Sequence, residues 1–104
     1  MKTEQHGTEM KDLIASGVTL LDFSASWCGP CKALEPVIEQ LRQSYAGQAV
    51  IKKVDIDEHR DLAVQMGIQS VPTLIVFKDG QEKQRLIGAQ SKDALQKALD
   101  AALS

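Results

Sequence analysis

The sequence lacks any long apolar run, and no stretch approaches the roughly 18 residues that a membrane-spanning helix needs. The N-terminal residues MKTEQHGTEMKDLIASG contain neither a continuous apolar segment nor the small-residue cleavage pattern of a signal peptide. No charge of one sign dominates, because 12 Lys and Arg residues stand against 14 Asp and Glu residues, giving a formal net charge of -2. We therefore expect a cytoplasmic chain that binds neither membranes nor nucleic acid and whose partners are small molecules or proteins.

Cysteine is also scarce. The chain has two cysteines, which are too few for the multi-bridge framework of a small secreted domain. The sequence contains no internal repeat, no low-complexity tract and no Pro/Gly/Ser-rich linker. A chain of 104 residues has room for one hydrophobic core, so residues 1–104 are expected to form a single domain.

Helical and strand patterns alternate along the chain with short connections, which is typical of α/β proteins. Apolar residues at helical spacing predict helices at residues 8–16, from the cysteines to Gly47, at 61–66 and at 91–103. Apolar and β-branched runs predict strands at residues 18–25, 49–57, 71–77 and 82–88. The first two strands flank a helix and should run parallel, whereas Lys78-Asp79-Gly80 makes the last two an antiparallel hairpin.

Both cysteines fall where a predicted strand ends and a helix begins. On a first helical turn the Cα atoms of Cys28 and Cys31 would lie roughly 5 Å apart, close enough for a disulfide. Cys28 should be the nucleophile, because the unpaired N–H groups and the dipole at a helix N-terminus favour its thiolate. Cys31 then becomes the resolving thiol. This arrangement indicates reversible dithiol–disulfide exchange through a mixed disulfide.

Two other interpretations of the cysteine pair stay open at this point. A structural zinc site usually has four protein ligands, and only the distant His6 and His59 could join the cysteines. The cysteines could also form an inert buried pair. A strand-to-helix turn within a βαβ unit favours redox use over both alternatives.

The residues around the cysteines are more specific than the pair itself. WCGPCK at residues 27–32 resembles the active-site segment of the thioredoxin family. The resemblance extends over nearly the whole chain through Asp22-Phe23, Pro36, KVDID at 53–57, VPT at 71–73, FKDG at 77–80 and Gly88. One departure is Ser24, which stands where many members of the family carry a second tryptophan.

The resemblance implies the thioredoxin fold, an α/β fold with a central mixed sheet of four to five strands flanked by four helices. The implied strand order is 1-3-2-4-5. Only the polar stretch KTEQH, residues 2–6, is available for the first strand. We therefore expect this edge strand to be weak or absent, with the junction that carries the cysteines intact.

The resemblance also implies roles for residues outside the cysteine pair. Asp22 would lie beneath Cys31 and assist its proton transfer, and Lys53 would be its nearby cationic partner. The alternatives are an exposed strand aspartate and a solvated lysine. Pro72 is expected to follow a cis peptide bond in a loop that faces an extended client peptide, the alternative being an ordinary trans proline at a strand start.

A mostly apolar surface around Cys28 would dock the client. Its expected members are Trp27, Gly29, Pro30, Ile56, Val71, Gly88 and Ala89. For Ile56 and Val71 ordinary core packing is an equal alternative, and Gly88 could instead serve a turn or bulge.

The sequence thus predicts a thioredoxin-type protein disulfide reductase that acts as a monomer on disulfide-containing client proteins. The resemblance implies no bound cofactor, because NADPH and FAD would act only through a partner thioredoxin reductase. Two alternatives are a dedicated electron donor to one partner enzyme and a protein-binding module whose affinity depends on its redox state.

Overall fold

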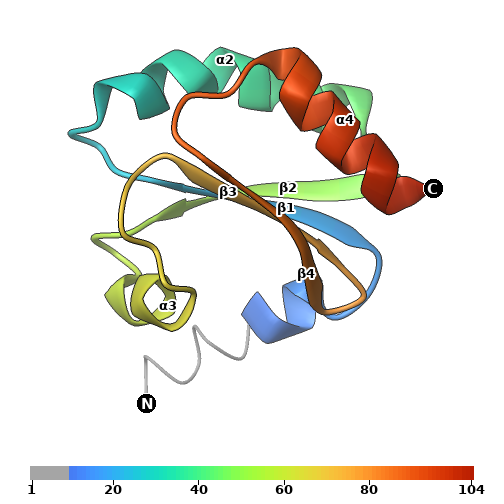
Figure 1. Cartoon of the computed structure of the whole chain (residues 1–104), viewed down its shortest axis with the longest axis horizontal. Coiled ribbons are helices and arrows are strands. Elements are labelled where there is room, and N and C mark those ends of the chain that lie inside the picture. The colour runs from blue at the N-terminus through green and yellow to red at the C-terminus, as the bar shows by residue number, and fades with distance from the viewer. Residues whose placement is uncertain (1–9) are drawn as a thin grey trace.

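The structure is a computed structural model and describes residues 10–104. Its elements are β1 (Val18–Ser24), α2 (Gly29–Ser44), β2 (Ala49–Asp55), α3 (Arg60–Gln65), β3 (Thr73–Lys78), β4 (Gln81–Ile87) and α4 (Lys92–Leu103). A further short helical segment covers residues 10–14. Helices α2 and α4 lie on one face of the sheet, and α3 and the 10–14 segment lie on the other (Figure 1). Within residues 10–104, no helix combines the length and apolarity needed to cross a membrane.

The four strands form one mixed sheet in the order β2-β1-β3-β4. β1 runs parallel to β2 and antiparallel to β3, and β3 runs antiparallel to β4. This is the predicted order without its first strand, so the α/β fold with four strands and four helical segments is confirmed. The expected first strand at residues 2–6 lies outside the described residues.

The local turn chemistry explains where the strands end. The β3–β4 hairpin turns at Asp79 and Gly80, whose φ angles of 51° and 85° suit the tight turn that the sequence predicts. The strand predicted at residues 49–57 begins as expected, but its predicted end is wrong, because β2 stops at Asp55. The Asp55 carboxylate accepts hydrogen bonds from the backbone N–H groups of Asp57 (2.8 Å) and Glu58 (3.3 Å), which turns the chain out of the sheet.

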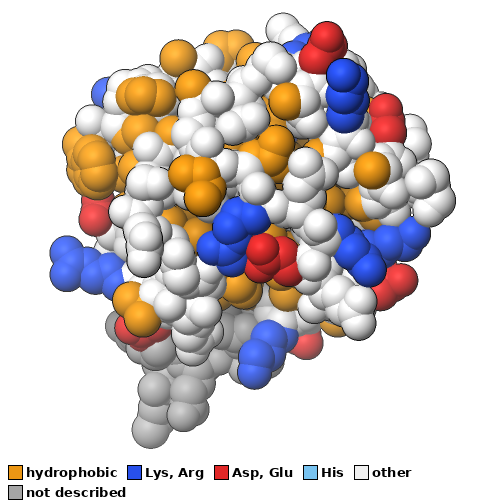
Figure 2. Space-filling view, viewed as in Figure 1, with side chains coloured by type: hydrophobic (Ala, Val, Ile, Leu, Met, Phe, Trp, Pro, Cys, Tyr) orange, Lys and Arg blue, Asp and Glu red, His pale blue; other side chains and the backbone are white. Residues whose placement is uncertain are grey.

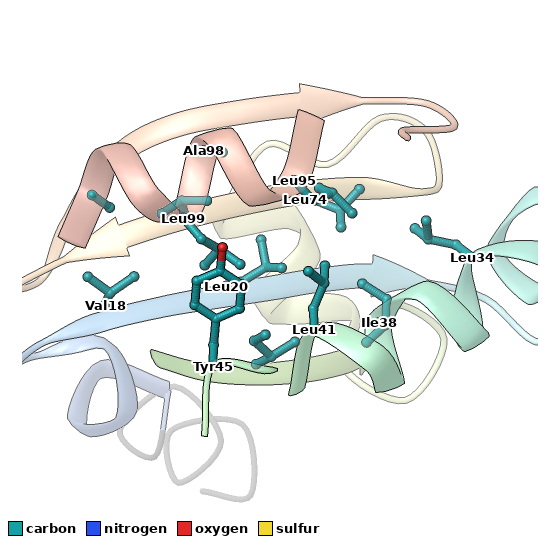
Figure 3. Close-up of a cluster of buried hydrophobic side chains, with 13 residues drawn as sticks. Val18, Leu20, Leu34, Ile38, Leu41, Tyr45, Leu74, Leu95, Ala98 and Leu99 are labelled. Carbon is teal, nitrogen blue, oxygen red and sulfur yellow. The ribbon is translucent and has the colours of Figure 1, made fainter. Parts of the chain in front are cut away.

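The main core lies between the sheet and the two helices α2 and α4 (Figure 3). Leu20 of β1, Leu41 of α2 and Leu99 of α4 are all fully buried in it. The face of α4 that carries Leu95, Ala98, Leu99 and Ala102 is buried. Ser91 caps that helix by accepting a hydrogen bond from the Ala94 N–H at 3.1 Å. These helices therefore shield one entire face of β1 from water.

The burial of β1 fixes the direction of its one acidic side chain. All seven residues of β1 are buried, and successive side chains point to opposite faces. Leu20 joins the cluster beneath α2 and α4, whereas Leu21 and Phe23 join the cluster on the α3 side. Asp22 shares the face of Leu20, so its carboxyl group lies under α2 and close to the start of that helix.

Candidate functional site

Cys28 and Cys31 form a disulfide at the junction of β1 and α2, with their Cα atoms 5.3 Å apart. Cys28 is the N-cap of α2, and the backbone N–H of Cys31 points at the Cys28 Sγ from 3.2 Å. Gly29 and Pro30 occupy the first two helical positions, where proline is well accommodated because its missing N–H would have no helical partner. The predicted disulfide geometry and helix N-terminus are both confirmed.

The zinc interpretation of the pair finds no support in this geometry. The two sulfur atoms are bonded to each other, and a zinc site would need them as separate thiolates. His6 lies outside the described residues. Within residues 10–104, no three side chains of His, Cys, Asp or Glu gather as ligands of a metal ion would.

The loop that joins α3 to β3 lies against the disulfide. The Val71–Pro72 peptide bond is cis, as expected, and the carbonyl oxygen of Val71 lies 3.8 Å from the Cys28 Sγ. Ala25, Ile56 and Val71 pack against the two cysteines. Ile56 and Val71 are therefore partly buried and also contact the disulfide. Each residue thus shows both the packing and the contact that were expected as alternatives.

Gly88 anchors the far edge of this loop. Its backbone N–H donates to the carbonyl oxygen of Pro72 at 2.8 Å, and its φ of 88° is a conformation that favours glycine. Ala89 follows it and is exposed. The structure thus places Gly88 against the Pro72 loop. Its positive φ also agrees with the alternative that Gly88 is needed for the backbone conformation where β4 ends.

Trp27 is an exposed residue beside the disulfide. It is 67% exposed, and its indole Nε1 donates to the Asp57 carboxylate at 2.9 Å. Figure 2 shows hydrophobic side chains gathered on the left of the molecule, over the loop that joins β1 to α2 in Figure 1. Asp57 was not among the predicted site residues, although the KVDID segment contains it. Its hydrogen bond fixes the direction of the indole beside the disulfide.

Reduction of the disulfide should raise the tryptophan emission of the protein. Trp27 is the one tryptophan of the chain and directly precedes Cys28, and a neighbouring disulfide quenches indole fluorescence. The measurement compares emission spectra of oxidised protein and of reduced protein whose thiols have been counted. Identical spectra would mean that the Asp57 hydrogen bond holds the indole away from the sulfur atoms.

Asp22 is buried, so the alternative of an exposed strand aspartate is wrong. The residue is 2% exposed, and its Oδ1 has no hydrogen-bond partner among residues 10–104. The pKa of Asp22 is raised to about 6, chiefly by burial. The charge of Lys53 opposes this rise, the charge of Glu35 adds to it, and the charge of Arg42 opposes it. Such a carboxyl group can exchange a proton close to neutral pH.

Lys53 lies beside Asp22 but pairs with another residue. The two are partners in the parallel β1–β2 ladder, yet the Lys53 ammonium donates to Glu35 Oε1 at 2.9 Å. The Lys53 side chain is 42% exposed. Lys53 is thus the nearby cation that the resemblance implies, and its direct ion pair with Glu35 was not expected.

Asp22 opens into a pocket of about 470 Å³, which we call the Asp22 pocket. Its lining residues are Asp22, Lys32, Glu35, Pro36, Ile38, Glu39, Arg42 and Lys53. Most of the charged side chains come from α2 at positions that helical periodicity places on the exposed side of the helix. Glu35, Glu39 and Arg42 were not predicted as site residues. The signal in the sequence that could have indicated Glu35 is its position one helical turn after Cys31.

The comparisons with known proteins agree with this geometry. The family model described as Thioredoxin matches residues 1–101. A thioredoxin of Staphylococcus aureus (strain Mu50) is 49% identical over 87 residues, which cover 84% of this chain and 84% of that protein. These matches span most of the chain, including the cysteine pair and the Pro72 loop.

Solved structures give the same result. A mutant thioredoxin from Halobacterium salinarum NRC-1 superposes with a TM-score of 0.85 at 40% identity, covering 93% of this chain and 85% of that one. Oxidised mitochondrial thioredoxin 3 from Saccharomyces cerevisiae gives a TM-score of 0.83 at 37% identity, covering 90% and 88%. With a Cys28–Cys31 disulfide at the helix start, these likenesses indicate a protein-disulfide oxidoreductase. The chain belongs to the thioredoxin family.

Proposed function

We propose that this protein is a general protein disulfide reductase in which Cys28 attacks the client disulfide and Cys31 resolves the mixed disulfide. The observation that supports these roles is the capping geometry of Cys28. Its sulfur lies at the N-terminus of α2 and faces the Cys31 N–H at 3.2 Å, and such a position stabilises a thiolate. Both cysteines are buried, at 5% and 2% exposed, but Cys31 lies one turn inside the helix behind Cys28, which suits a thiol that reacts with its neighbour.

The proposed exchange balances electrons in two steps. The Cys28 thiolate forms a bond to one client sulfur, and the client disulfide breaks and releases its other sulfur as a thiolate. Cys31 then gives its proton to the Asp22 carboxylate, its sulfur bonds to the Cys28 sulfur, and the client leaves with both sulfurs reduced. The protein ends in the oxidised state that the structure shows.

Trp27 and the Pro72 loop form the proposed docking surface for the client. Trp27 is exposed on one side of the disulfide, and Val71 approaches the Cys28 sulfur from the other. Gly29, Pro30 and Ala89 are exposed near these residues or in the adjoining loop. An extended client segment laid across this surface would bring its disulfide to Cys28.

The oxidised protein needs an external source of electrons. We assign that role to an NADPH-dependent flavoprotein of the thioredoxin reductase type, so this chain itself would need no bound cofactor. A reducing, cytoplasmic setting and a monomeric state suit such a cycle. Another solved structure with which the chain superposes is described as concerning the thiol resolving mechanism of a yeast mitochondrial 1-Cys peroxiredoxin via glutathione and thioredoxin systems (TM-score 0.84, 36% identity). A peroxidase of this kind is therefore a reasonable candidate client.

The proposal is tested by mixing the dithiol form with several unrelated protein disulfides, such as insulin and an oxidised peroxidase. A general reductase should reduce all of them, and the rate should rise with protein concentration. Turnover with only one client would support a dedicated electron donor instead. Binding that changes with redox state but produces no client thiols would support a binding module.

A further inference from the structure

Lys53 lies within reach of two carboxylates and pairs with only one of them. Asp22 and Lys53 are directly opposite on adjacent strands, and both line the Asp22 pocket. The Lys53 ammonium nevertheless donates to Glu35 of α2 at 2.9 Å, while the buried Asp22 Oδ1 has no hydrogen-bond partner in the part of the chain that the structure describes. An unpaired buried carboxylate is costly and would attract a nearby ammonium strongly. The position of the ammonium therefore needs a cause, and Glu35 is the group that holds it.

We propose that Glu35 is a positioning residue that pairs with Lys53 at the mouth of the Asp22 pocket and thereby keeps the ammonium from pairing with the Asp22 carboxylate. The inference deepens the proposed function, because it rests on Asp22 as the proton acceptor for Cys31. An ammonium bonded directly to Asp22 would stabilise the ionised carboxylate and make it a weaker base. Glu35 thus preserves the basicity that the resolving step uses.

Arg42, another basic side chain of the pocket, is held by partners of its own. Arg42 donates from its Nε to the Ile51 carbonyl oxygen at 3.3 Å, and its guanidinium also pairs with Glu39. Lys32 and Glu39 line the pocket from the same helix, and β3 places the uncharged Leu74 beside Asp22. Lys53 is the cation opposite Asp22, and its ammonium pairs with the Glu35 carboxylate. Replacement of Glu35 should consequently free the Lys53 ammonium and leave the contacts of Arg42 in place.

The first test compares Glu35→Gln with Glu39→Gln, which removes a carboxylate from the same helix and the same pocket. The pKa of Asp22 is read from the pH dependence of its carboxyl carbon resonance in labelled, oxidised protein. Glu35→Gln should lower this pKa, whereas Glu39→Gln should leave it close to that of the unaltered protein. An unchanged pKa in Glu35→Gln, or an equal drop in both variants, would overturn the proposal.

A double variant separates positioning from the direct field of the Glu35 charge. In a Lys53→Met background there is no ammonium to hold, so Glu35→Gln should shift the Asp22 pKa much less than it does alone. An equal shift in the two backgrounds would show that Glu35 acts only through its own charge, which would refute the positioning role. The Glu35–Lys53 side chains are 52% and 42% exposed, so losing this ion pair should itself cost little stability.

The kinetic consequence is measured by rapid mixing of the dithiol form with a coloured aromatic disulfide. The first phase, attack by Cys28, depends on reagent concentration, and the second phase, resolution by Cys31, does not. At pH values above the Asp22 pKa, Glu35→Gln should slow the second phase by roughly twofold to fourfold and leave the first unchanged. If the pKa falls as expected while the second phase keeps its rate, the positioning role stands and the proton-transfer role of Asp22 fails.

Discussion

Cys31→Ser should turn catalysis into the formation of a stable one-to-one adduct with the client. The variant keeps the Cys28 thiolate at the N-terminus of α2, so it can still attack a client disulfide. It lacks the thiol that would release the client, and the chain contains no third cysteine to replace it. Mass spectrometry under non-reducing conditions should find one client sulfur bonded to Cys28, and turnover should fall by roughly three orders of magnitude or more.

Cys28→Ser is the matched control for this experiment. It removes the capping sulfur and leaves Cys31 one turn inside the helix, where the residue is only 2% exposed. Turnover should be lost to a similar extent, but no adduct should accumulate, because Cys31 is poorly placed to meet an external disulfide. Adducts of equal yield in the two variants would contradict the assignment of Cys28 as attacking thiol and Cys31 as resolving thiol.

Asp22→Asn should slow resolution and stabilise the fold at the same time. The variant removes the proposed proton acceptor of Cys31, so the resolving phase should slow by roughly tenfold to a hundredfold at neutral pH. The attack by Cys28 should keep its rate. Because the Asp22 pKa is about 6, the difference between the two proteins should shrink below that pH, where Asp22 itself becomes protonated. A resolving phase of equal rate at neutral pH would remove the proton-transfer role.

The effect of Asp22→Asn on stability has a defined pH dependence. The pKa of Asp22 is about 6 in the folded protein against an ordinary value of 3.8, so folding disfavours the ionised form. The native protein therefore loses stability as the pH rises through this window, and the loss is complete above about pH 6. Replacement by neutral asparagine should recover on the order of 3 kcal/mol at pH 8 and nothing well below pH 4.

Denaturant unfolding at several pH values measures this difference. An Asp12→Asn variant provides the control, because Asp12 is exposed and its loss removes a carboxylate without relieving burial. The gain in stability should occur only in Asp22→Asn, and it should be fully present only at pH values above the Asp22 pKa of about 6. A lower stability for Asp22→Asn at pH 8 would mean that the carboxylate makes a favourable interaction in the folded protein.

Features set by neighbouring residues could be predicted from the sequence. The Asp79-Gly80 turn depends on local conformation and the helix at α4 on helical periodicity, and both were confirmed. The disulfide separation followed from helix geometry alone. The end of β2 could not be predicted, because a strand-like run of residues gave no sign that the Asp55 side chain would bond the following backbone.

Contacts between side chains far apart in the sequence could not be predicted, for a different reason. Glu35 and Lys53 meet across 18 positions, and Trp27 and Asp57 meet across 30. Helical periodicity places Glu35 on the exposed side of α2, and it does not say which cation of the neighbouring strand that side chain reaches. The choice of Lys53 between Glu35 and Asp22 depends on how α2 packs on the sheet.

The outer strand β4 has a consequence for self-association. It ends the described sheet on one side, where unpaired backbone groups could template pairing with another copy of the chain. Its first five residues, Gln81 to Arg85, are all polar or charged, and a bulge at Val76 and Phe77 interrupts its pairing with β3. Both features discourage edge-to-edge pairing between molecules. Concentrated solutions of the protein should therefore resist amyloid-like aggregation through this strand.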